Sequence, residues 1–233
     1  MRIVGELRKL EIDVSATLVR NVLRAAGVPP APQRGQLHWC SFLRQHAATT
    51  LACDFFTVDT VLLRRLYVLV FLRIGTRRIE YIACTSNPDG VWMMQQARNL
   101  LMDLDGRTLR PRFLIHDRDA KFSRAFDAIF QGEGMEVIRT PIRAPNANVE
   151  RWVGSVRREC LDRLLIFGRR QLDGVVRVYV HHYNERRPHR ALDLRAPDAR
   201  ATPSTRGEPA ESGGLRRRDL LGGLIHEYQP AAA

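Results

Sequence analysis

The stretch from residue 113 to residue 122 constrains the fold of this chain more than any other part of its sequence. Its first three residues are apolar, and the acidic residues Asp117 and Asp119 follow closely. A short apolar run that ends on polar residues is typical of a buried strand. Because α/β sheets present ligand-binding groups at the carboxyl ends of their strands, we expect a strand over 113–115 that leads into a carboxylate site.

Two other carboxylates are candidates to join that site. Asp54 lies inside the apolar run 51–56, and burying an ionised carboxylate is costly unless it is paired or coordinated. Glu150 lies in the first turn of a predicted helix that Asn148 would cap. The acids therefore follow one another on a first strand, a fourth strand and the next helix, and such elements can converge at one edge of a sheet.

Each of these acids also has a purely structural interpretation. Asp54 could pair with one of the many arginines of the chain. Asp117 and Asp119 are common turn residues, and Glu150 could simply complement the dipole of its helix. The sequence leaves both interpretations open for each residue taken singly, and the order of the acids along the chain favours a common site.

The spacing of the apolar residues predicts an α/β fold. We expect strands over residues 51–58, 67–75, 79–85, 113–115 and 135–139, and helices over residues 91–104, 122–130, 148–160 and 170–184. Three strands followed by alternating helices and strands give a mixed five-stranded sheet flanked by helices.

The two ends of the chain predict smaller parts. Residues 1–28 predict two short helices, of which Ser15 would cap the second, and they could form a partial helix-turn-helix-like segment or a helical hairpin that packs on the main domain. Prolines and glycines in 29–48 predict a linker, and 49–195 would be the main domain. Residues 196–214 are rich in Pro, Ala, Gly, Ser and Thr and predict disorder, so 196–233 would be a mostly disordered tail, and residues 215–233 have no assigned role.

The charge of the chain indicates a polyanionic partner. Its net charge is +12 and its pI is near 10.6, values typical of proteins that bind nucleic acid. Almost all of the basic residues are arginines, which suit phosphate contacts, although a GC-rich genome would produce the same bias. No signal peptide or membrane span is expected, so the protein should be soluble and cytoplasmic. Cys53 and Cys84 lie in apolar runs and should be buried free thiols.

Four segments together resemble the integrase core (DDE) domain of bacterial insertion-sequence transposases, which is part of the retroviral integrase superfamily. The segments are Ala52-Cys53-Asp54-Phe55-Phe56, Asp117-Arg118-Asp119-Ala120-Lys121-Phe122, Asn146-Ala147-Asn148-Val149-Glu150-Arg151-Trp152 and Tyr183-Asn184-Glu185-Arg186-Arg187-Pro188-His189-Arg190-Ala191-Leu192. The resemblance covers about residues 1–198. It implies an RNase H-like fold.

The resemblance also implies a chemistry. Asp54, Asp117 and Glu150 would be the catalytic residues and the ligands of two Mg²⁺ ions, with Mn²⁺ as a substitute. The chain would then cleave DNA at the ends of an insertion sequence and transfer the strands to target DNA. Its partners would be the DNA of the element ends, the target DNA and further copies of the chain. The candidate DNA contacts are Arg151, Arg157, Arg158, Lys121 and Arg143. His116 and His189 are expected to have structural roles.

One departure from the family pattern keeps two alternatives open. Asp117 and Glu150 are separated by 32 residues, about two fewer than is usual in such cores, and two residues inside a helix would rotate a carboxylate by about 200°. Glu150 still lies off the apolar face of its helix, so the loop 141–147 is the better place for the loss. The alternatives are a nuclease of the same fold that cuts without joining, and a catalytically inactive protein that only binds DNA.

Overall fold

The computed structural model describes residues 2–28, 39, 41–106, 110–140, 147–198 and 215–230. The chain divides into two compact units, residues 1–45 and residues 46–233, and each is described by itself. Arg143 and most of the predicted linker lie outside the described residues, although residues 41–46 are helical. Within the described ranges, no helix is long and apolar enough to cross a membrane.

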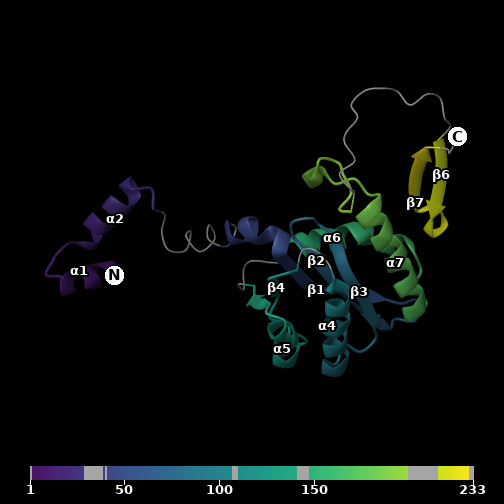
Figure 1. Ribbon diagram of the computed structural model, residues 1–233, viewed down its shortest axis with the longest axis horizontal. Coiled ribbons are helices and arrows are strands. Elements are labelled where there is room, and N and C mark those ends of the chain that lie inside the picture. The colour runs from purple at the N-terminus through teal and green to yellow at the C-terminus, as the bar shows by residue number, and fades with distance from the viewer. Residues whose placement is uncertain are drawn as a thin grey trace. The chain divides into compact units, whose positions relative to one another are not determined.

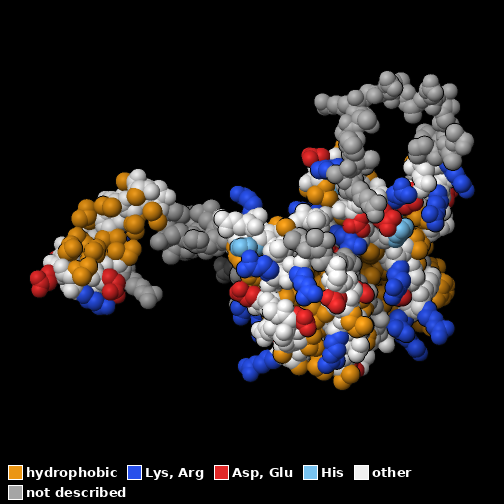
Figure 2. Space-filling view, in the orientation of Figure 1, with side chains coloured by type: hydrophobic (Ala, Val, Ile, Leu, Met, Phe, Trp, Pro, Cys, Tyr) orange, Lys and Arg blue, Asp and Glu red, His pale blue; other side chains and the backbone are white. Residues whose placement is uncertain are grey.

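The first unit contains the two predicted helices, α1 (Arg2–Lys9) and α2 (Ala16–Ala25). The Ser15 hydroxyl accepts a hydrogen bond from the Leu18 backbone N–H at 3.1 Å, which confirms the predicted cap. Apolar side chains of both helices are exposed, and Figure 2 shows them covering much of this unit. A role of this unit in binding DNA stays a prediction.

The second unit is built on a mixed five-stranded sheet, as predicted (Figure 1). Its strands are β1 (Thr50–Asp59), β2 (Arg65–Arg73), β3 (Ile79–Thr85), β4 (Phe113–His116) and β5 (Glu136–Arg139). The spatial order is β3-β2-β1-β4-β5. The pairs β1–β2 and β2–β3 are antiparallel, whereas β1–β4 and β4–β5 are parallel.

Helices cover both faces of this sheet. The α-helices are α4 (Gly90–Leu104), α5 (Arg124–Gly132), α6 (Ala147–Glu159) and α7 (Arg169–Glu185). Short 3₁₀ turns are η1 (Ala47–Thr49), η2 (Leu161–Arg163), η3 (Arg190–Leu192) and η4 (Leu221–Gly223). Asn148 is the second residue of α6 rather than its cap, because the helix already begins at Ala147.

Alternate residues of β1 face opposite helix layers, as the two-residue period of a strand requires. Leu51 and Cys53 belong to the core cluster that α4 and α5 complete, and Cys53 is buried as predicted. Phe56 faces the other way, where its ring meets that of Trp152 on α6 at 5.9 Å. The predicted apolar stripe of α6 is therefore its inner face, and Val149 and Trp152 are almost fully buried.

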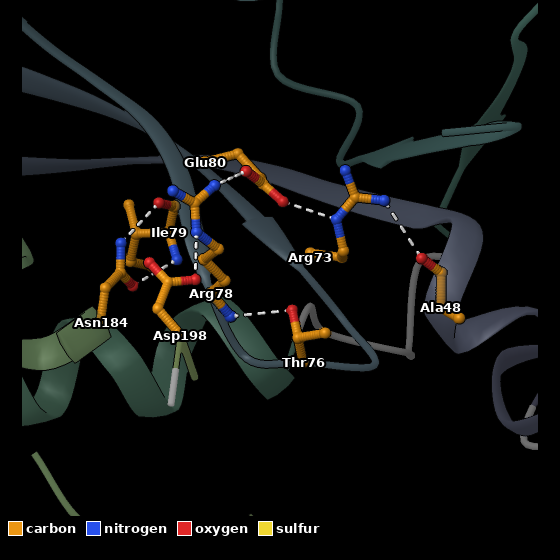
Figure 3. Close-up of polar contacts among 8 residues, drawn as sticks. All are labelled: Ala48, Arg73, Thr76, Arg78, Ile79, Glu80, Asn184 and Asp198. Atoms are coloured by element: carbon orange, nitrogen blue, oxygen red, sulfur yellow. Dashed lines mark hydrogen bonds and ion pairs between the residues drawn. The ribbon is translucent and has the colours of Figure 1, made fainter. Parts of the chain in front are cut away.

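The end of α7 is fastened to the edge strand β3. The Asn184 side chain accepts from the Ile79 backbone N–H and donates to the Ile79 carbonyl, both at 2.9 Å (Figure 3). This amide satisfies a backbone N–H and C=O that an edge strand would otherwise leave unpaired. His189 contacts the Tyr183 ring with centroids 4.5 Å apart. The Asn184 side chain of the motif 183–192 therefore joins the end of α7 to the sheet.

His116 also has the structural role that the sequence predicted. It is fully buried at the end of β4, stacks on Phe122 with ring centroids 4.5 Å apart, and lies 3.0 Å from an Asp127 carboxylate oxygen through Nε2. These contacts tie β4 to α5.

Residues 215–230 are a folded part of the segment that was expected to be mostly disordered. They form a hairpin of β6 (Leu215–Leu220) and β7 (Ile225–Pro230). Glu227 is buried against His182 of α7, with 3.0 Å between Oε1 and Nδ1, and Ile225 is buried as well. The remaining predicted tail residues, 199–214 and 231–233, lie outside the described residues.

Candidate active site

The register of β1 and β4 places Asp54 beside Asp117. These parallel strands pair Thr50 with Phe113 and Ala52 with Ile115. The pairing ends there. Asp54 lies two residues further along β1, and Asp117 directly follows the last residue of β4, so both acids lie at the same end of these neighbouring strands. Two acids that are far apart in the sequence therefore meet at the carboxyl end of β4.

The third acid comes from the helix layer that Asp54 faces. Asp54 shares its side of β1 with Phe56, which packs on α6, because residues two apart in a strand point the same way. Phe55 points to the opposite layer, where its ring meets that of Phe122 at 5.7 Å. Glu150 lies in the first turn of α6, on the exposed side of the buried stripe.

The electrostatics of Asp54 show that these acids influence one another. The pKa of Asp54 is raised to about 6, mainly by partial burial and also by the negative charges of Asp117, Glu150 and Asp119, while a hydrogen bond from the Phe55 N–H lowers it. The charged groups with the largest effect on this carboxyl are the three acids Asp117, Glu150 and Asp119. Such an excess of negative charge favours a bound cation.

The acids are neighbours without forming a closed coordination sphere. Among the described residues, no three His, Cys, Asp or Glu side chains are grouped closely enough to hold a metal ion. The donor chemistry nevertheless fits a hard divalent cation, because carboxylate oxygens are the ligands that Mg²⁺ and Mn²⁺ prefer. Asp54, Asp117 and Glu150 as ligands stay a prediction, and the exposed Glu150 is the group that would have to close the site.

Two further acids near these elements are already paired. Both Asp119 oxygens accept from Lys121, one from its backbone N–H at 2.9 Å and one from Nζ at 2.7 Å. Burial raises the pKa of Asp119, but Lys121 outweighs it, so the pKa lies below its ordinary value. The Glu159 oxygens accept from Arg187 at 2.6 and 3.0 Å and from Tyr179 at 2.8 Å. Neither acid is therefore free to replace a member of the predicted trio.

The candidate DNA contacts have different surroundings. Arg157 donates to the Thr57 carbonyl at 2.6 Å and lies over the Phe56 ring, so it holds α6 against β1. Lys121 is bound to Asp119, and its Nζ lies 5.6 Å from the centre of the Phe55 ring. The other two described candidates, Arg151 and Arg158, are exposed. Figure 2 shows basic side chains over the visible face of this unit, with acidic ones among them.

The contact that Arg77 makes beside α6 could not be predicted from the sequence. Arg77, in the turn between β2 and β3, donates from Nη1 to the Asn148 side-chain oxygen, 71 residues along the chain. Nothing in the pattern around Arg77 distinguishes it from the other arginines, since its role depends on a contact that only the fold creates.

Comparison with known proteins relates this arrangement to a family. Residues 132–197, which include α6 and α7, match the family model described as an integrase core domain. No curated protein matches the chain in sequence. The catalytic domain of Mos1 mariner transposase has a TM-score of 0.51 at 13% identity, over 60% of this chain and 74% of that chain. A second Mos1 structure, with raltegravir and Mn, gives 0.50 at 13% identity, over 60% and 75%.

A viral protein has a similar fold. The intasome of simian T-cell lymphotropic virus, in complex with the PP2A regulatory subunit B56 gamma, has a TM-score of 0.53 at 11% identity, over 76% of this chain and 65% of that chain. At these identities the likeness shows the fold, which is the RNase H-like fold of transposase and integrase catalytic domains. Together with the family-model match, it confirms the resemblance to the integrase and transposase superfamily.

The raised pKa of Asp54 predicts an inverted pH dependence of stability. Between about pH 4 and pH 6 the folded protein keeps a proton on this carboxyl that the unfolded chain has lost, so the metal-free protein becomes less stable as the pH rises. At pH 8 we expect Asp54→Asn to raise the free energy of unfolding by on the order of 2 kcal/mol, after a discount for partial exposure. Below pH 4 the difference should vanish. Urea unfolding in EDTA, followed by circular dichroism, measures both values.

Asp59→Asn is the matched control for this substitution. Asp59 is an exposed acid on the same strand, and its hydrogen bond with Arg65 lowers its pKa. Its removal should therefore not stabilise the protein at high pH. A stability difference between wild type and Asp54→Asn that stays the same at every pH would contradict the prediction.

Proposed function

We propose that the chain is a metal-dependent transposase or integrase that cuts DNA and transfers the cut strands to a second DNA. The observation that carries this proposal is the parallel pairing of β1 and β4, because Asp54 and Asp117 follow that pairing on the two chains and the charge of Asp117 raises the pKa of Asp54. The influence of Glu150 on the pKa of Asp54 supports a third member. The fold of transposase and integrase catalytic domains agrees with this chemistry.

Each residue would have a defined role in that reaction. Asp54 on β1 and Asp117, directly after β4, would fix one side of a divalent-ion site, and Glu150 would close it from α6. Two Mg²⁺ ions held by such carboxylates would supply an activated nucleophile and would stabilise the leaving oxygen of an in-line phosphoryl transfer. Asp117 suits this role better than Asp119, because within the described part of the chain only one Asp117 oxygen accepts a hydrogen bond, from the Asp119 N–H at 3.0 Å.

The proposed partners follow from the charge and the fold. DNA suits the net charge of +12 and the exposed Arg151 and Arg158 on α6, since phosphates attract clustered arginines without regard to sequence. We propose Mg²⁺ as the metal, with Mn²⁺ as a substitute, and several copies of the chain acting together on paired insertion-sequence ends. Solved Mos1 catalytic domains carry Mn or Mg.

A catalytically inactive DNA-binding protein is the second candidate. It is favoured by the open arrangement of the acids, because the described residues contain no group of three that could hold a metal ion. A nuclease that cuts without joining is the third candidate, and the same chemistry at the same residues would support it.

One assay separates the three candidates. Labelled duplexes from the DNA that flanks the coding sequence would be incubated with the full chain, a supercoiled plasmid and Mg²⁺. Labelled DNA joined to the plasmid supports a transposase or integrase, and labelled fragments alone support a nuclease. A mobility shift without any Mg²⁺- or Mn²⁺-dependent product would contradict both enzyme candidates.

A further inference from the structure

The turn between β2 and β3 is a rigid part of the second unit. The Gly75 N–H donates to the Ala47 carbonyl at 2.8 Å. A Cβ on Gly75 would lie only 2.9 Å from backbone atoms of Ala48, so only glycine fits here. The Arg77 N–H donates to the Arg73 carbonyl at 2.8 Å, which closes the turn. The backbone of this turn is therefore fixed against the chain that precedes β1.

An ionic network around the buried Glu80 holds the same turn (Figure 3). Arg73 donates to Glu80 at 2.5 Å, and less than a tenth of either side chain is exposed. Arg78 pairs with Glu80 as well, and with Asp198 at 2.6 Å. Charges that are removed from water are held in place by their partners, so these contacts restrict the turn further.

Arg77 projects from this turn to the start of α6. Its φ angle is +64°, in the left-handed region that non-glycine residues rarely adopt. Its guanidinium is partly buried and donates to the side-chain oxygen of Asn148. Burial and the neighbouring Arg151 both lower the pKa of Arg77. A strained backbone and a desolvated cation persist only where the surrounding structure holds them.

The first turn of α6 is where such a contact has the most effect. Helix ends fray because their first N–H groups have no partner inside the helix. Asn148 is the second residue of α6, and Glu150 follows two positions later. The buried Val149 and Trp152 fix the inner side of the helix. The hydrogen bond from Arg77 to Asn148 therefore connects the first turn of α6 to the rigid β2–β3 turn. This connection lies two residues from the exposed Glu150.

We propose that Arg77 is a positioning residue for the candidate metal site. By holding Asn148, it fixes the first turn of α6 and hence the place from which Glu150 reaches towards Asp54 and Asp117. The inference rests on the proposed function, because it assigns Arg77 to the same site.

The test is a double-mutant cycle on Mn²⁺ affinity, measured by calorimetry with the full chain and without DNA. The variants are Arg77→Ala, Asn148→Ala and the double variant. Each single substitution should weaken Mn²⁺ binding about tenfold, the value of one hydrogen bond to a charged group, and the double variant should bind no more weakly than either. The sign is informative, because the loss of a nearby positive charge would by itself strengthen cation binding.

Controls separate positioning from general damage. Arg177→Ala removes the same charge and breaks an exposed ion pair with Asp173 on α7, so it should change Mn²⁺ affinity less than twofold. The unfolding midpoint of each variant shows whether the fold is intact. Should Arg77→Ala fail to fold, the uncharged change Asn148→Ala carries the test alone.

Failure of this inference differs from failure of the proposed function. If the wild-type chain binds no Mn²⁺ saturably, the proposed function is wrong. If the wild type binds Mn²⁺ and Asn148→Ala binds it equally well, Arg77 is not a positioning residue. The inference would also be overturned if the two losses of Mn²⁺ affinity added up fully in the double variant. Arg77 and Asn148 share one hydrogen bond, so either substitution alone already removes it.

Discussion

Asp117→Asn is expected to reduce Mg²⁺-dependent DNA cleavage by about 10³-fold while DNA affinity changes less than about twofold. The substitution keeps the size of the side chain and removes one of the charges that would hold the metal ions. DNA binding depends on basic residues elsewhere, so it should be preserved. Single-turnover cleavage of a labelled duplex and a fluorescence anisotropy titration measure the two quantities.

Asp119→Asn is the matched control for this substitution. It removes the same charge two residues away, from a carboxylate that Lys121 already occupies through both oxygens. We expect a loss of cleavage below about tenfold, because Asp119 is paired in the folded protein. Cleavage retained by Asp117→Asn, or an equal loss in both variants, would remove Asp117 from the site.

Glu80→Gln is expected to lower the free energy of unfolding by about 3 kcal/mol. Glu80 is the buried anion of the network around the β2–β3 turn, where it forms ion pairs with both Arg73 and Arg78. A neutral amide of the same shape leaves the buried Arg73 guanidinium without its counter-charge. Urea unfolding at pH 7, followed by tryptophan fluorescence, measures the change.

Asp173→Asn serves as the control for the buried network. It breaks an i,i+4 ion pair with Arg177 on the surface of α7, and exposed pairs of this kind contribute about 0.5 kcal/mol. Equal effects of the two substitutions would show that the network around Glu80 contributes no more than a surface pair.

Much of the fold could be predicted from the sequence, because the elements have strong periods. The apolar runs of β1 and β2 are buried on both faces, and the stripe of α6 faces the sheet. The candidate acids could be named because an aspartate inside an apolar strand is costly and needs a reason. Their neighbourhood follows from the parallel pairing of β1 with β4.

The remaining features depend on contacts between distant residues. Neither the bond from Arg77 to Asn148 nor the pairing of Arg187 with Glu159 leaves a local pattern, since arginine is common throughout the chain. The hairpin β6–β7 was missed because its first strand, 215–220, carries three consecutive arginines, which hide the two-residue alternation of a strand. Its buried Glu227 has a partner only because α7 presents His182.

The anchoring of α6 bears on the short spacing between Asp117 and Glu150. The helix is fixed by contacts along its own length: Trp152 against Phe56, Arg157 on the Thr57 carbonyl and Glu159 on Arg187. Because these contacts fix the position of α6, the chain that leads into the helix needs only to be long enough to reach it. The direction of Glu150 is therefore set by these contacts of α6, so the number of residues between Asp117 and Glu150 is by itself a poor guide to whether the carboxylate can reach the site.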